Sequence, residues 1–186
     1  MSESVCPFWV GYLLLNPLRK KLQNPETLLT PYVKPGMTVG DIGSAMGFFS
    51  LPMADMVGPS GRVVCVDIQS KMLKKLKKRA AKAGVDAVME YRVCSRTSLH
   101  LETPGQPYDF LLASAVVHEV PDAKALFEES FRVLKPDGRL LLSEPAGHVS
   151  QATFDHEVFI AEESGFHVIK VLSERRTLGV VLEKPA

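Results

Sequence analysis

A carboxylate and two glycines lie close together where one expected element ends and the next begins. The segment 39–50 reads VGDIGSAMGFFS, so that an apolar run containing Asp41 gives way to Gly43 and Gly47. Glycine lets the backbone turn sharply and approach a ligand without a Cβ atom in the way. The N–H groups at the start of a following helix suit an anionic group, and Asp41 suits a cationic one. The segment therefore predicts a site for a small charged ligand.

The spacing argues against the phosphate-binding versions of such a loop. In a dinucleotide-binding G-x-G-x-x-G pattern the third glycine would fall at position 48, where the chain has Phe48. No Gly-Lys-Ser/Thr follows, so the loop is not a Walker phosphate loop either. A glycine pattern alone is weak evidence, and a strand-to-helix turn without a ligand is the simplest alternative.

A second group of polar residues follows the expected strand 108–114. Here the chain reads SAVVHE from Ser114 to Glu119. His118 has an ordinary pKa near ~6.5 and is able to accept a proton, while Glu119 is able to orient it or to cap a helix. The alternative is that His118 only packs beside the ligand. Glu144 ends another expected strand, where it lines an acceptor pocket or is a solvated strand end.

Short β-like apolar runs alternate with helix-period segments along the chain. We expect strands at 38–42, 62–67, 90–94, 108–114, 139–144, 166–172 and 177–182, and helices at 47–57, 71–83, 122–134 and 151–164. This alternation predicts an α/β fold in which a mostly parallel sheet carries helices on both faces. The turns 58–61 and 135–138 separate helices from strands. Only four residues separate the last two strands, too few for a parallel crossover, so we expect an antiparallel hairpin.

Size and composition favour one ordinary globular domain. The chain has 186 residues, of which 46% are hydrophobic, with 22 Lys and Arg against 21 Asp and Glu, so no charged partner is indicated. Three widely spaced cysteines do not suggest a disulfide framework, and we expect a cytoplasmic protein. The apolar run 8–15 is too short to span a membrane. We expect one domain, 1–186, with 1–35 as a helical N-terminal extension.

Read as acid-x-Gly-x-small-x-Gly, residues 41–47 resemble the first motif of class I S-adenosylmethionine-dependent methyltransferases. The match runs from about residue 37 to the C-terminus and includes the closing hairpin. The resemblance implies a Rossmann-like seven-stranded sheet, a cofactor-binding core at 37–186, S-adenosyl-L-methionine as cofactor and S-adenosyl-L-homocysteine as product. Within the class the chain is similar to the broad small-molecule group that includes quinone-biosynthesis methyltransferases.

The resemblance also implies roles for particular residues. It places Asp67, about 20 residues beyond the loop, where it would accept hydrogen bonds from ribose hydroxyls. The implied cofactor-binding residues are Asp41, Gly43, Ser44, Ala45, Gly47, Asp67, Ile68, Ser95 and Ser114. Ala45 stands where the family commonly has glycine, and its methyl group disfavours a positive φ, so we expect weakened cofactor binding. In this family the loop after the fourth strand faces the transferred methyl group, which makes His118 and Glu119 candidate catalytic residues.

The acceptor pocket is less well defined by sequence. We expect Trp9, Tyr12 and Glu144 to contribute to it, with the N-terminal aromatic residues as a lid over an apolar substrate. A helix packed on the edge of the sheet is the alternative for the N-terminal segment. The loop after the fourth strand lacks the Asn/Asp-Pro-Pro-Tyr/Phe signature of methyltransferases that act on adenine or glutamine amides, so those substrates are not expected.

Three other functions remain open on sequence alone. A cofactor-binding module without catalysis is consistent with Ala45 and with the lack of a certain base. An RNA methyltransferase is suggested by seven basic residues within 71–82, but the apolar residues between them predict a solvated helix face, and the net charge of +1 gives no broad basic surface. Methylation of arsenite through Cys6 and Cys94 is the third. No Cys-x-x-Cys spacing suggests a metal, and we expect a small-molecule substrate.

Overall fold

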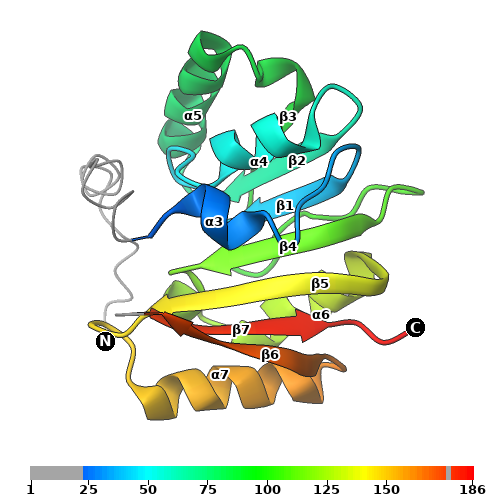
Figure 1. The fold of residues 1–186 in the computed structure, drawn as a ribbon. Coiled ribbons are helices and arrows are strands. Elements are labelled where there is room, and N and C mark those ends of the chain that lie inside the picture. The colour runs from blue at the N-terminus through cyan, green and yellow to red at the C-terminus, as the bar shows by residue number, and fades with distance from the viewer. Residues whose placement is uncertain (1–22, 175–176) are drawn as a thin grey trace.

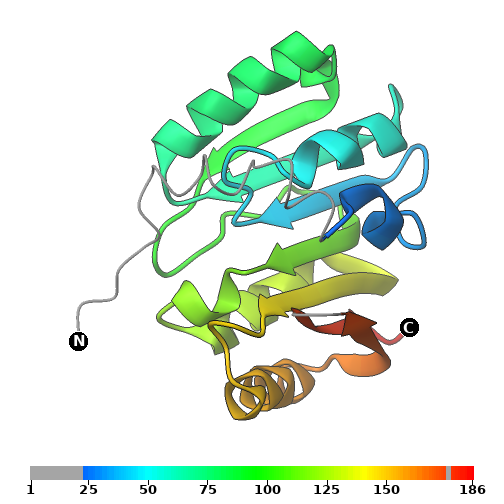
Figure 2. The same cartoon turned by 60° about the vertical axis from the view of Figure 1, so that its left-hand side comes forward.

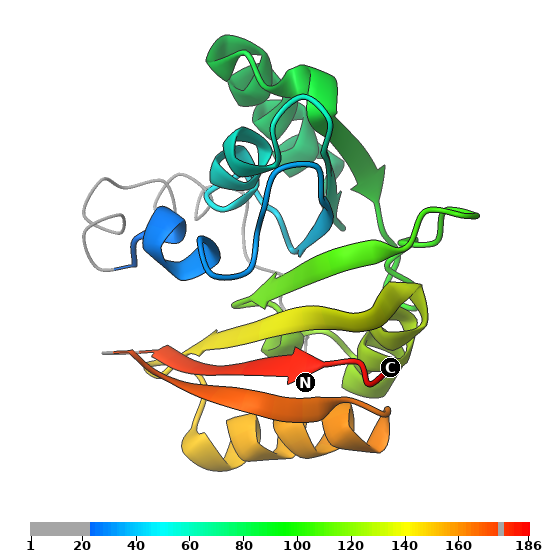
Figure 3. The ribbon, with the colours of Figure 1, turned by 45° about the vertical axis from the view of Figure 1, so that its right-hand side comes forward.

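A seven-stranded sheet forms the centre of the protein, which we describe from a computed structural model for residues 23–174 and 177–186. Its strands lie side by side in the order β3-β2-β1-β4-β5-β7-β6 (Figures 1 and 3). The strands are β1 (Thr38–Ile42), β2 (Arg62–Asp67), β3 (Met89–Val93), β4 (Tyr108–Ser114), β5 (Leu134–Pro145), β6 (His167–Glu174) and β7 (Thr177–Glu183). The first five pair in parallel, whereas β7 pairs antiparallel with both β5 and β6.

Helices cover both faces of the sheet because the strand residues alternate between two apolar faces. In β2, Val63 and Cys65 pack toward one side and Val64 and Val66 toward the other, and all four are completely buried. The helices are α3 (Pro25–Leu29), α4 (Ser50–Val57), α5 (Ser70–Ala83), α6 (Ala123–Val133) and α7 (Gln151–Glu163), with short 3₁₀ turns η1 (Asp86–Val88) and η2 (Val117–Glu119). The first three pack on one face, and α6 and α7 pack on the other.

The predicted fold class is confirmed, and so is the antiparallel hairpin at the C-terminus. Strands β1, β2 and β4 have the predicted bounds. No helix within 23–174 or 177–186 has both the length and the apolar character needed to cross a membrane.

Two element boundaries differ from the prediction by three residues or more, and the others differ by at most two. β5 begins at Leu134 rather than at 139, because the expected turn 135–138 is held in the sheet: the Asp137 N–H donates to the Lys184 carbonyl (2.8 Å), and the Lys184 N–H donates to the Gly138 carbonyl (2.9 Å). α4 begins at Ser50 rather than at 47. Gly47 has a φ of 84°, which is incompatible with an α-helix, and its N–H closes a turn on the Ser44 carbonyl.

The loops that follow the parallel strands gather at one edge of the sheet (Figure 2). From β1 the order runs outward through β2 and β3 in one direction and through β4 and β5 in the other. The connections therefore diverge at the carboxyl ends of β1 and β4. In open α/β sheets such a point of divergence forms the crevice in which ligands bind.

Candidate functional site

A cavity of about 260 Å³ lies at this carboxyl edge. Loops after β1, β2, β3 and β4 line it, together with part of α6. Six of the predicted cofactor-binding and catalytic residues are among its walls, namely Gly43, Ala45, Asp67, Ile68, Ser95 and Glu119. The fold therefore brings together residues that are as much as 76 positions apart in the chain, from Gly43 to Glu119.

The glycine loop approaches the loop after β4 closely at Gly43. Its φ is 73°, and a Cβ atom at this position would lie 2.8 Å from Cγ2 of Val116. The N–H groups of Gly43 and Ser44 both donate to the Val66 carbonyl at 2.9 Å. A larger residue at position 43 would displace Val116, itself part of the cavity wall, so glycine is required for the shape of the cavity.

Asp67 joins the loop after β2 to the glycine loop. Its Oδ2 accepts a hydrogen bond from the Ala45 N–H (2.9 Å), and its Oδ1 accepts one from the Gln69 N–H (2.7 Å). Burial raises the pKa of Asp67, although these two N–H groups act in the opposite direction. A carboxylate has about four acceptor positions. Two are used here, so Asp67 retains capacity to accept hydrogen bonds from hydroxyl groups in the cavity.

Ala45 adopts a backbone conformation that glycine would adopt more readily. Its φ is 45°, in the left-handed region. For a residue with a Cβ atom this region costs roughly 1–2 kcal/mol. The departure from the family pattern noted in the sequence is therefore a site of backbone strain within the cavity wall.

We expect Ala45→Gly to stabilise the protein by about 0.5–1 kcal/mol, because relief of the left-handed conformation outweighs the greater freedom of glycine in the unfolded chain. Urea unfolding measures the change. The matched control is Ala81→Gly on the exposed side of α5, which is expected to lose about 1 kcal/mol. If Ala45→Gly lost as much stability as the control, the positive φ of Ala45 would not strain the backbone.

The other predicted residues of the loop lie behind the cavity rather than in its wall. Asp41 is buried in β1, and its Oδ2 accepts a hydrogen bond from the Ser50 hydroxyl at the start of α4. Ser44 is also buried. Gly47 packs against α5, where a Cβ atom would lie 2.1 Å from Cδ1 of Leu76. These residues set the position of the loop.

Glu129 on α6 holds the loop after β3 and was not singled out from sequence. Its carboxylate accepts hydrogen bonds from the N–H groups of Leu99 (2.8 Å) and Leu101 (2.9 Å) and from the Ser98 hydroxyl (3.1 Å). Within the same loop, the Ser95 hydroxyl accepts from the Ser98 N–H (3.0 Å). The signal in the sequence is an acid on the buried face of a helix, where periodicity places apolar residues.

Replacing Glu129 by Gln is expected to destabilise the protein by about 1–2 kcal/mol, because an amide has one acceptor oxygen for the three donors. Thermal unfolding followed by circular dichroism measures the loss. Glu128→Gln is the control, since Glu128 lies on the exposed side of the same helix. Equal stability of the two variants would show that Glu129 does not hold the loop.

His118 in η2 is bound by Glu144 rather than by its neighbour in sequence. Its Nδ1 lies 2.6 Å from Oε2 of Glu144, and the Glu144 Oε1 accepts hydrogen bonds from the N–H groups of Val117 (2.9 Å) and His118 (3.4 Å). Oε1 of Glu119 is 3.9 Å from Nε2 of His118. The hydrogen bond to Glu144 raises the pKa of His118, while burial lowers it.

The structure places two further predicted residues, Glu144 and Ser114, outside the cavity wall. Glu144, expected in the acceptor pocket, is completely buried and is bonded to η2. Ser114 lies in register with Ser143 at the end of β4, beside rather than in the cavity. Trp9 and Tyr12 lie outside the described residues.

The two described cysteines differ in their surroundings. Cys65 is completely buried in β2, and Cys94 lines the cavity, where burial raises the pKa of its thiol to about 11. Within 23–174 and 177–186, no cluster of three or more His, Cys, Asp and Glu side chains is arranged to hold a metal ion.

This sheet, with a glycine loop after β1 and an acid at the end of β2, defines a class I S-adenosylmethionine-dependent methyltransferase. The family described as "Methyltransferase domain" matches residues 33–173, and the chain belongs to it. A crystal structure of a SAM dependent methyltransferase from Aquifex aeolicus is similar over 97% of this chain and 100% of that one, with a TM-score of 0.86 and 25% identity.

Two curated relatives share about a third of their aligned residues with this chain. The arsenite methyltransferase of Halobacterium salinarum is 32% identical over 76% of the chain and 34% of its own length. The ubiquinone/menaquinone biosynthesis C-methyltransferase UbiE of Enterobacter sp. (strain 638) is 34% identical over 60% of the chain and 44% of its own length. The chain thus spans less than half the length of either relative.

Proposed function

We propose that this chain binds S-adenosylmethionine in the cavity and transfers its methyl group to a small-molecule acceptor, with S-adenosylhomocysteine as product. The observation that carries the proposal is the position of Asp67, whose carboxylate lines the cavity while holding the glycine loop. A bare strand-to-helix turn would not need an acid in this place.

The cavity residues fit the parts of this cofactor. The remaining acceptor positions of Asp67 suit the two ribose hydroxyls. Ile68, Met72 and Leu99 line the same cavity as Asp67 and supply apolar surface for an adenine ring. Gly43 lets Val116 pack against the glycine loop, and both residues line the cavity in which we propose the cofactor binds.

The cofactor supplies a methyl group activated by the positive sulfonium. Because transfer is an in-line displacement, the protein contributes mainly by orienting the acceptor. Val116, Glu119 and Val120 form the cavity wall after β4 and are the residues we propose to contact the acceptor. Glu119 and Asp122 are polar groups of this wall, and Oε1 of Glu119 lies 3.9 Å from Nε2 of His118.

The name of the Halobacterium relative refers to arsenite, and that of the Enterobacter relative refers to ubiquinone and menaquinone biosynthesis. We favour an organic acceptor of the quinone kind over arsenite. The Cys94 thiol, with a pKa of about 11, is protonated near neutral pH and is therefore a poor metalloid ligand. Cys65 is closed off within the sheet.

Calorimetric titration with S-adenosylmethionine and S-adenosylhomocysteine tests the cofactor. Transfer of a labelled methyl group to hydroxynaphthoquinones, to arsenite with glutathione, and to RNA then tests the acceptor. We expect binding of both nucleosides and transfer to the quinone. Binding without transfer to any acceptor would favour a non-catalytic module, and absence of binding by folded protein would refute the proposal.

A further inference from the structure

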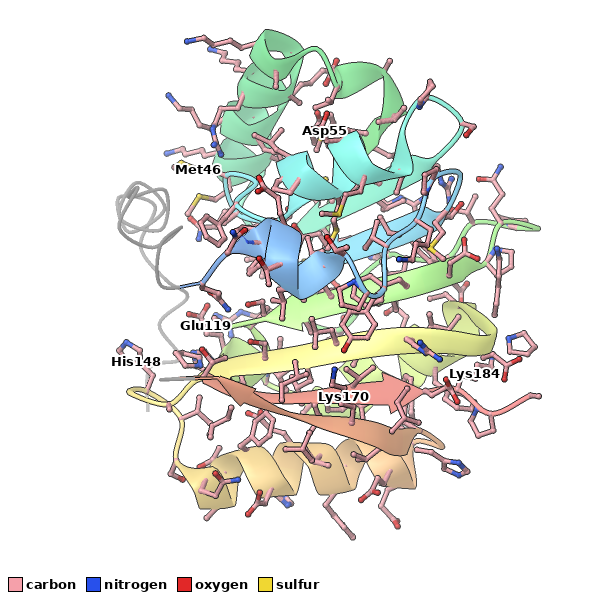
Figure 4. The ribbon with its side chains drawn as sticks, in the orientation of Figure 1. Met46, Asp55, Glu119, His148, Lys170 and Lys184 are labelled. Atoms are coloured by element: carbon pink, nitrogen blue, oxygen red, sulfur yellow. The ribbon has the colours of Figure 1, made fainter. Side chains whose placement is uncertain are left out.

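The cavity wall contains a histidine, His148, that was not among the predicted site residues. It belongs to the connection between β5 and α7, and so adds this connection to the walls formed after β1 to β4. Figure 4 shows His148 and Glu119 at the same edge of the sheet. His118, expected from sequence to accept a proton, is not part of the described wall, and its Nδ1 is bonded to Glu144. His148 is therefore the histidine placed to meet a molecule in the cavity.

Backbone contacts fix the position of His148 directly after β5. The N–H groups of His148 (2.9 Å) and Val149 (3.0 Å) both donate to the Pro145 carbonyl at the end of the strand. Val149 is only 4% exposed and packs in the core on the face that α6 and α7 cover. Ser150 then caps α7 by accepting a hydrogen bond from the Thr153 N–H (3.1 Å). The turn is thus anchored on both sides of His148.

The side chain of His148 is accessible from the cavity and from solvent. The residue is exposed although it lines the cavity, so it lies where the cavity opens. Within the described residues, no group forms a hydrogen bond with its ring. A neutral imidazole has one nitrogen that accepts a hydrogen bond and one that donates. The ring is therefore able to take a proton from a molecule in the cavity and to pass it to water.

Most other ionisable groups of the cavity wall are unsuited to this task. They are Asp67, Cys94, Arg96, Glu119, Asp122 and Glu129. Asp67 holds the glycine loop, Glu129 holds the loop after β3, and Asp122 caps α6 by accepting from the Ala125 N–H (2.9 Å). The Cys94 thiol, with a pKa of about 11, is protonated near neutral pH, and an arginine keeps its proton in proteins. Glu119 and His148 remain.

The choice between these two groups follows from their chemistry. Imidazole is the side chain whose charge changes most readily around neutral pH, which suits it to accept a proton and release it in each turnover. The described wall carries four carboxyl groups, those of Asp67, Glu119, Asp122 and Glu129, and one arginine. This excess of acids favours the imidazolium that forms and disfavours a further negative charge.

We propose that His148 is a catalytic residue that removes the proton of an acceptor carrying a hydroxyl group, such as a phenol or an enol. This inference rests on the proposed function for the identity of the reaction. The oxygen–hydrogen bond of the acceptor breaks, the proton goes to a ring nitrogen of His148, and the electron pair stays on the acceptor. That oxygen, or a carbon conjugated with it, forms the bond to the methyl carbon, and the electron pair of the broken carbon–sulfur bond stays on sulfur. His148 then releases the proton to solvent.

Nuclear magnetic resonance of nitrogen-labelled histidine tests the inference without any reaction. With S-adenosylhomocysteine bound, no methyl group is present to be transferred. Under anaerobic conditions, naphthohydroquinone is expected to shift the ring signals of His148, because the ring shares the proton of the hydroxyl group. Its dimethoxy analogue has no such proton and should leave the signals in place. His148→Gln assigns the signals, and those of His156, on the exposed side of α7, should not move with either compound.

Turnover gives a second readout. His148→Ala is expected to lower kcat for naphthohydroquinone roughly 100-fold or more, with affinity for S-adenosylhomocysteine unchanged. The loss should be smaller for a hydroxynaphthoquinone, because its more acidic hydroxyl group ionises without a base. Added imidazole should restore part of the rate in His148→Ala but not in His148→Gln, whose amide fills the place and accepts no proton. His156→Ala is the matched control and should keep the wild-type rate.

The outcomes separate this inference from the proposed function. A wild-type rate in His148→Ala, or His148 signals that respond equally to the hydroxyl and methoxy compounds, would overturn the inference. A loss of rate in Glu119→Gln but not in His148→Ala would assign the proton to Glu119 instead. If the wild type transferred no methyl group although the His148 signals still responded to the hydroxyl compound, the proposed function would fail and His148 would remain a residue that binds a hydroxyl-bearing ligand.

Discussion

Asp67→Ala is expected to weaken binding of S-adenosylhomocysteine by about 1.5–3 kcal/mol, or roughly 10- to 150-fold, because hydrogen bonds to a charged carboxylate are lost. The same substitution removes the acceptor of the Ala45 N–H, so the loop loses a contact as well. Calorimetry measures the affinity, and Asp55→Ala on the exposed side of α4 (Figure 4) controls for the loss of one negative charge.

A ligand variant separates the two roles of Asp67. With 2′-deoxy-S-adenosylhomocysteine the wild type should lose affinity, whereas Asp67→Ala should bind both ligands about equally, since the partner of the hydroxyl is already gone. If the variant still distinguished the two ligands as strongly as the wild type does, Asp67 would not contact the ribose.

Glu157→Gln is expected to remove most of the loss of stability that the wild type shows between about pH 4.5 and 7. Glu157 is a buried residue of α7, and burial raises its pKa to about 7 from an ordinary value of 4.5. The folded protein therefore binds more protons than the unfolded chain in this window. Stability therefore falls as pH rises through the window. The difference corresponds to roughly 3 kcal/mol, at about 1.4 kcal/mol for each pKa unit.

His118 contributes in the same direction. Its pKa is raised by Glu144, so its contribution is present below its ordinary pKa of 6.5 and is lost as pH rises through the folded value. Urea unfolding at pH 4 to 8 measures both effects. Glu157→Gln should retain the slopes that come from His118 and from Asp67, whose pKa is also raised, and Glu162→Gln, on the exposed side of α7, should follow the wild type. If the stability of Glu157→Gln depended on pH as strongly as that of the wild type, Glu157 would not be the group responsible.

The alternation of strands and helices was predictable because it depends on local apolar periodicity. The bounds of β1, β2 and β4 followed from apolar runs flanked by polar residues. The hairpin followed from the length of one connection. By contrast, the start of β5 depends on pairing of Asp137 and Gly138 with Lys184, nearly 50 residues away, which no local pattern records.

The site was predictable where motifs act through the backbone and not where side chains meet across the fold. The glycine loop was found from its sequence pattern and Asp67 from the family resemblance, and the two do meet. Glu119 was expected to orient His118 or to cap a helix, and the structure adds Glu144 from the end of β5, which bonds the other ring nitrogen. Glu129 and Glu157 are recognisable only as acids on apolar helix faces, a signal that does not say what they contact.

The hydrogen bond between Ala45 and Asp67 has a consequence for the kinetics of ligand capture. Because it ties the glycine loop to the end of β2 through groups of the protein itself, the chain holds these two walls of the cavity together. A ligand then meets a preorganised surface, and little chain entropy is lost on binding. Association should accordingly be governed by diffusion into the cavity, and differences in affinity among nucleoside ligands should be expressed mainly in how slowly they leave.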